Sequence, residues 1–97
     1  METAFVFPSR RRISADDREV FGQWLSEKRA KKGVDQWDVA TTLSQWLGTG
    51  WPQTRISGIE RGTYKSLSRR DIVLLAVVVG ADPVEGLEVA GQIPPSS

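Results

Sequence analysis

Cysteine and histidine are both missing from this chain of 97 residues. The lack of cysteine excludes a disulfide framework and a thiolate metal site, and the lack of histidine removes the commonest metal ligand and the usual acid–base catalyst. The sequence also lacks the GxSxG and SxxK nucleophile patterns and any glycine pattern that cradles phosphate. We therefore expect no enzymatic activity, no metal and no cofactor.

Long hydrophobic segments are missing as well. The longest apolar run, residues 72–79, is far shorter than the ~20 residues that a membrane helix needs. The apolar residues 4–7 are too few for a signal peptide, and the cations follow them instead of preceding them. We expect a single cytoplasmic domain with one core and no membrane partner.

What is present is an uneven distribution of charge. The net charge is only +1, but residues 71–97 carry acids and no base, whereas residues 50–70 carry one acid, Glu60, and the cations Arg55, Arg61, Lys65, Arg69 and Arg70. Such a basic segment attracts a polyphosphate, because each neutralised phosphate releases condensed counterions. An ordinary solvated surface has mixed charges too, so composition alone leaves both interpretations open.

Capping residues and terminal glycines predict the first two helices. The first begins at Ser14, with Asp17 three residues later, and ends at Gly33 after a run of cations. The second begins at Asp35 and stops at Gly48. Helical spacing predicts their inward faces, which are Val20, Phe21, Trp24 and Leu25 in the first helix and Val39, Ala40, Leu43 and Leu47 in the second.

The same signals predict three more helices. Pro52 suits the first turn of a short third helix that ends at Gly62, and Ser68 caps a fourth that ends at Gly80. The β-branched residues 77–79 leave a buried strand over residues 72–79 as the alternative to this fourth helix. Asp82 caps a fifth. We expect a flexible basic arm over residues 1–13, a helical domain over 14–90 and a disordered tail over 91–97.

The order of these pieces resembles the Cro/Xre (phage-repressor type) helix-turn-helix family over about residues 18 to 90. The resemblance rests on Arg29 and Gly33, on Gln36 followed by Val39 and Ala40, and on the segment Ile56-Ser57-x-Ile59-Glu60-Arg61-Gly62. It implies an all-α, five-helix, repressor-like fold. It also implies a partly buried ion pair between Arg29 and Glu60, which holds the recognition helix against the core.

The resemblance implies that the third helix lies in the major groove of DNA. Its candidate base-contacting residues are Gln53, Thr54, Arg55 and Ser57, and Arg55 suits either a guanine edge or a phosphate. The candidate phosphate-contacting residues are Gln36, Arg61, Thr63, Tyr64, Lys65, Arg69 and Arg70. Gln36 resembles a family glutamine that also braces the first recognition side chain. Arg10, Arg11 and Arg12 form either a DNA-binding arm or a solubilising segment.

One departure from the family is an extended connection between the second and third helices. Gln36 and Gln53 are 17 positions apart, farther than their counterparts, and residues 44–51 amount to an insertion. We expect Trp46 and Trp51 to pack this loop onto the core, with an exposed anchor for a partner as the alternative. Trp37 lies off the inward stripe and is the better candidate for an exposed contact.

These observations favour a sequence-specific regulator of transcription that binds double-stranded DNA as a homodimer, acting as a repressor. We expect the dimer to form through an apolar strip of the last helix, made of Val84, Leu87 and Val89. The alternative is a protein-interaction module, antitoxin-like or a co-regulator, that binds a protein through the Trp46/Trp51 loop. Fold alone does not decide between them.

Overall fold

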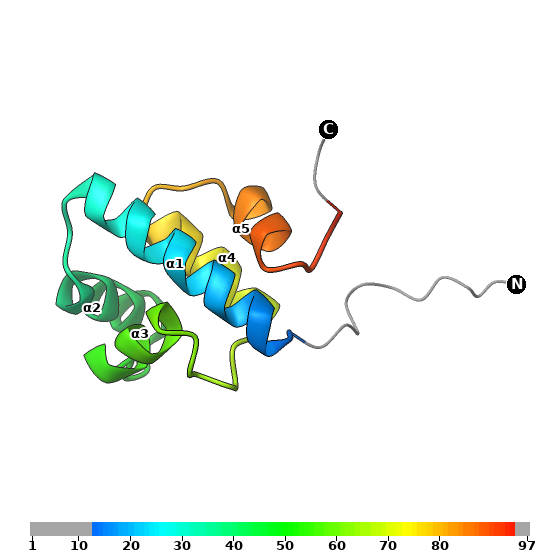
Figure 1. The fold of residues 1–97 in the computed structure, drawn as a ribbon. Helices are drawn as coiled ribbons and strands as arrows, with labels where there is room; N and C mark the ends of the chain where they lie inside the picture. The colour runs from blue at the N-terminus through cyan, green and yellow to red at the C-terminus, as the bar shows by residue number, and fades with distance from the viewer. Residues whose placement is uncertain (1–12, 95–97) are drawn as a thin grey trace, which may run out of the picture.

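The computed structural model describes residues 13–94, and within this range the chain is all-α (Figure 1). Its five helices are α1 (Ala15–Lys32), α2 (Gln36–Leu47), α3 (Gln53–Glu60), α4 (Arg69–Val78) and α5 (Pro83–Val89). The helical fold expected from the sequence is confirmed. Residues 72–78 belong to α4, so the alternative of a buried strand there is wrong. No described helix is long and apolar enough to cross a membrane.

Side-chain caps begin four of the helices where the sequence predicts them. The Ser14 hydroxyl accepts a hydrogen bond from the Asp17 backbone at the start of α1. Asp35 with Asp38, and Ser68 with Asp71, form reciprocal capping boxes at the starts of α2 and α4. The Asp82 carboxylate accepts from the backbone N–H of Val84 in α5. These caps satisfy orphan N–H groups that would otherwise lack a partner.

The core joins all five helices, and its largest fully buried side chains are apolar with one exception, Gln92. Helix α1 packs against α3 and α5, α2 packs against α3 and α4, and α4 packs against α5. In Figure 1, α2 and α3 lie together at one end of the molecule and α5 lies toward the other. The core side chains include Phe21, Leu25, Val39, Leu43, Ile56, Ile59, Ile72 and Leu75.

The inward face of α1 differs from the predicted stripe at one position. Val20 is 52% exposed, although Phe21, Trp24 and Leu25 are buried as expected. Gly22 is buried as well, because it faces the end of α3: a Cβ built there would lie 2.4 Å from the carbonyl oxygen of Ile59. The buried face is therefore centred on Phe21, Gly22 and Leu25, and this turns Val20 toward solvent.

The packed part of the chain continues past α5 through Ala90, Gly91 and Gln92. Gly91 takes a positive φ of 70°, and a Cβ built on it would lie 2.8 Å from a carboxylate oxygen of Asp17 in α1. Gln92 is 1% exposed and donates its side-chain N–H to the carbonyl oxygen of Ala90. The expected tail begins at 91, but the packed part of the chain thus reaches Gln92.

Candidate nucleic-acid interface

The connection between α2 and α3 consists of residues 48–52, and it is held to α2 by Ser44. The Ser44 hydroxyl donates to the carbonyl oxygen of Ala40 and accepts a 2.8 Å hydrogen bond from the backbone N–H of Trp51. Gly48 ends α2 with a positive φ of 67°, a conformation that favours glycine. The second helix ends at Gly48 as the sequence predicts, so residues 44–47 of the expected insertion are helical and residues 48–51 lie in the connection.

Trp51 and Trp46 behave differently, although we expected both to pack. Trp51 is buried in the core, whereas Trp46 in the last turn of α2 is 51% exposed. The hydrogen bond from the Trp51 backbone to the Ser44 hydroxyl holds Trp51 against α2, where its side chain covers the core. The expectation for Trp46 is therefore wrong.

Arg29 and Glu60 form the ion pair that the resemblance implies. Arg29 donates from Nε to Glu60 Oε2 at 2.6 Å and from Nη2 to Oε1 at 3.0 Å, and its Nη1 donates to the carbonyl oxygen of Val34. The two side chains are 19% and 6% exposed. The hydrogen bonds to Glu60 raise the pKa of Arg29 against the opposing effect of burial, and the charges of Glu60 and Asp35 add to the increase.

Two glutamines extend this pair toward the first turn of α3. Gln36 at the start of α2 donates to Glu60 Oε1 at 2.9 Å, and its own side-chain oxygen accepts from Gln53 Nε2. Gln36 therefore contacts Gln53, as expected from its family counterpart. Because a glutamine amide has two N–H groups and an acceptor oxygen, Gln53 keeps one N–H and its oxygen for a ligand. Those are the two groups that a bidentate contact with adenine requires.

Arg55 contacts two aromatic rings, which we did not predict from the sequence. Its guanidinium lies over the Trp51 ring at 4.8 Å and over the Tyr64 ring at 5.7 Å from the centroids. The residue is half-buried. Both rings come from outside α3: Trp51 from the connection before it and Tyr64 from the loop after it. The sequence signal that we missed is the spacing of four residues between Trp51 and Arg55.

The remaining base-contact candidates differ in availability. Thr54 in the first turn of α3 is exposed. Ser57 is half-buried, and its hydroxyl accepts a hydrogen bond from Arg61 Nη1. Gly58 is buried and faces Thr63 and Tyr64 rather than solvent. The outward surface at the start of α3 therefore consists chiefly of Gln53, Thr54 and Arg55.

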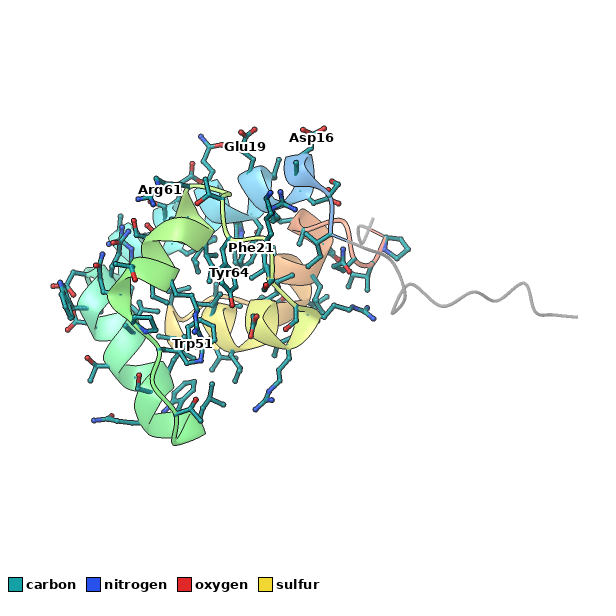
Figure 2. The ribbon with its side chains drawn as sticks, turned by 90° about the horizontal axis from the view of Figure 1, so that it is seen from below. Asp16, Glu19, Phe21, Trp51, Arg61 and Tyr64 are labelled. Carbon is teal, nitrogen blue, oxygen red and sulfur yellow. The ribbon has the colours of Figure 1, made fainter. Side chains whose placement is uncertain are left out.

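Most of the phosphate-contact candidates lie at the end of α3, in the loop that follows it and at the start of α4. Arg61, Lys65 and Arg70 are exposed and Arg69 is half-buried. Thr63 is exposed, although its hydroxyl donates to the carbonyl oxygen of Gly58. Tyr64 is partly buried and packs against the core. In Figure 2 the labelled rings of Tyr64 and Trp51 lie toward the middle of the molecule, whereas Arg61 lies at its outline.

Acidic residues border this basic surface. Gly62 approaches α1 closely, because a Cβ built there would lie 3.0 Å from the Cα atom of Glu19. Glu19 and Asp16 are both exposed, and both lie at the molecular outline in Figure 2. The start of α1 thus limits the positive surface on the Gly62 side.

A groove of about 340 Å³ lies between α2 and the start of α3. Its lining includes Trp37, Thr41, Trp51 and Gln53. Trp37 is 67% exposed, in agreement with its position off the inward stripe of α2. An aromatic side chain therefore stands beside the proposed base-contacting turn.

Some predicted features lie elsewhere or outside the described residues. Arg10, Arg11 and Arg12 lie outside them. Of the three residues expected to form an apolar strip for dimerisation, Leu87 and Val89 are partly buried against the core and only Val84 remains exposed. The strip predicted on the last helix is therefore not formed, because the helix uses two of its three apolar side chains in its own domain.

We compared the chain with family models, with curated proteins and with solved structures, and none of them matches it. Assignment to the Cro/Xre family consequently stays a prediction that rests on the residues of this chain.

Proposed function

We propose that the protein is a sequence-specific regulator of transcription that binds double-stranded DNA through α3 and the loop that follows it. The proposal rests mainly on the position of Glu60, the single acidic residue among residues 50–70. Glu60 is 6% exposed and paired with Arg29 of α1, so its charge is compensated inside the protein. The neighbouring cations Arg61, Lys65 and Arg70 then face solvent without an exposed acid from their own segment.

The first turn of α3 supports the same proposal. Gln53 presents a side-chain amide with one N–H and its oxygen unused, Thr54 presents an exposed hydroxyl, and Arg55 presents a guanidinium. These groups match the hydrogen-bonding edges that bases present in the major groove, where the N-terminal residues of a recognition helix make contact. The cations that follow α3 in the sequence, Arg61, Lys65 and Arg70, suit the phosphates that flank a recognition helix.

Selection from a random pool of DNA duplexes, followed by a salt series on the selected sequence, tests the proposal. We expect one preferred sequence and an affinity that falls steeply with added salt, because phosphate contacts release counterions. Replacing Lys65 or Arg70 by alanine should weaken binding to all sequences alike and reduce the salt slope by about 1 each. The mass of the complex then gives the number of protein copies per duplex, and two copies support the proposed homodimer. Binding without sequence preference contradicts the proposal.

A second candidate function is a protein-interaction module, and the exposure of Trp46 favours it. This ring is 51% exposed at the end of α2 and is not among the residues that line the groove beside α3. An exposed tryptophan is a common anchor in protein interfaces. Here the Trp46→Ala variant should lose the partner, whereas added salt should weaken a mainly hydrophobic contact only slightly.

A further inference from the structure

Arg55 is held in place before any ligand arrives. Its guanidinium carbon lies 4.8 Å from the Trp51 ring centroid and 5.7 Å from that of Tyr64. Trp51 is buried in the core, and Tyr64 packs against it. Both rings are thus anchored, and stacking on anchored rings restricts a long side chain that would otherwise sample many rotamers.

The stacked guanidinium still has its hydrogen-bonding groups available. The backbone N–H of Arg55 donates to the carbonyl oxygen of Pro52, but no hydrogen bond or ion pair involves its side chain within the described residues, and none of its side-chain nitrogen atoms is buried without a partner. The N–H groups of a guanidinium form a fixed planar fork that matches two acceptors in one plane. Arg55 therefore carries an unused pair of donors in the first turn of α3, held in place by its ring contacts.

A guanidinium fork can bind a phosphate as well as a base edge. The exposed cations Arg61, Lys65 and Arg70 already provide charge for phosphates. Base recognition requires donors at set positions, and the pair of acceptors in the major groove that fits a guanidinium fork is O6 and N7 of guanine. From the ring contacts and the free donor edge, we infer that Arg55 is a specificity residue that selects guanine, with Trp51 and Tyr64 as positioning residues. This inference rests on the proposed DNA-binding function.

The test compares the base preferences of the wild type with those of R55K and R70K, by selection from a random duplex pool. R55K keeps the charge but lacks the planar fork, so preference for one guanine should fall by at least roughly fivefold while other positions keep theirs. R70K makes the same chemical change at an exposed cation that contacts no aromatic ring among residues 13–94. Any effect of R70K should therefore fall equally on all sequences.

Two further measurements separate positioning from folding. In the free protein, the Nε–H group of Arg55 should show a higher NMR order parameter than that of Arg70. Tyr64→Leu removes one ring at a partly buried position, and it should lower both that order parameter and the guanine preference while the helical circular dichroism is retained.

The base preferences of the wild type and of R55K test the role of Arg55 separately from the proposed DNA-binding function. A uniform loss of affinity in R55K, with every base preference unchanged, assigns Arg55 to a phosphate and overturns the inference while the proposed function stands. Absence of any preference in the wild type overturns both. Selective loss at one guanine supports both.

Discussion

The Arg29–Glu60 pair links α1 to the end of α3 by two hydrogen bonds between charged groups. Because the pKa of Arg29 is raised in the folded protein, the contribution of its charged form is fully present below the ordinary guanidinium pKa. That contribution is lost only as the pH rises through the raised value, in the strongly alkaline range. Arg29 therefore stays charged at every pH at which binding would be measured.

Replacing Arg29 by methionine should lower the free energy of unfolding by about 3 to 5 kcal/mol, because the buried Glu60 carboxylate loses its counter-charge. Urea denaturation of the wild type and the variant measures this difference. The double variant Arg29→Met with Glu60→Gln is the control. It removes the stranded charge and should recover part of the loss. A single variant as stable as the wild type would contradict the role of the pair.

The site residues differ in how far the sequence predicts them. The resemblance implied the Arg29–Glu60 pair and the contact between Gln36 and Gln53, and both are present, although the spacing of the two glutamines departs from the family. The stacking of Arg55 did not, because it depends on where the connection places Trp51 and on how the later loop returns Tyr64. The spacing of four residues between Trp51 and Arg55 is visible in the sequence, but the contacts also depend on tertiary structure, which that spacing alone does not determine.

At the scale of elements, α1 approaches the end of α3 closely at Gly22. A Cβ built on Gly22 would lie 2.4 Å and 2.5 Å from the carbonyl oxygens of Ile59 and Glu60. Backbone atoms cannot move aside as a flexible side chain can. The absence of a side chain at residue 22 therefore allows α1 to approach α3.

Gly22→Ala should destabilise the protein by an amount near the upper end of the roughly 1 to 3 kcal/mol that overpacking costs. Alanine favours a helix over glycine by about 1 kcal/mol, which is too little to offset a clash with backbone. Thermal and urea unfolding measure the effect. Gly58→Ala is the matched control: Gly58 is also buried in a helix, but its added Cβ would meet Thr63 Oγ1 at an ordinary 3.5 Å. The control should be neutral or stabilising.

The boundaries of the helices followed from the sequence because they are set by local chemistry. Ser14, Asp35, Ser68 and Asp82 act on N–H groups two or three residues away. The faces of the helices were harder to predict. The exposure of Val20 depends on the approach of α1 to α3, and that of Trp46 on the return of the connection to α2, and neither is visible within one helix.

At the scale of the whole molecule, the two exposed tryptophans lie on different sides of α2. Trp37 and Trp46 are nine residues apart, which is two and a half turns at about 3.6 residues per turn. Trp37 borders the groove beside the first turn of α3, and Trp46 is not among the residues that line it. The two rings therefore report on two different surfaces.

Acrylamide quenching of tryptophan fluorescence should distinguish these surfaces. In the Trp46→Phe variant, Trp37 is the main exposed fluorophore, and a bound duplex should protect it from the quencher if DNA lies along α3. In the Trp37→Phe variant, Trp46 should remain equally accessible with and without DNA. Protection of Trp46 instead of Trp37 would place the duplex on another face and contradict the proposed interface.

The side chains of Arg29, Glu60, Gln36 and Gln53 form one hydrogen-bonded series that passes through α1, α2 and α3. A substitution at residue 53 would leave the Gln36 oxygen without its donor, and a substitution at residue 36 would take one donor from Glu60. In evolution, a descendant of this chain would therefore acquire a new target most readily by exchanging residues 36 and 53 together, so that these two positions should vary in concert.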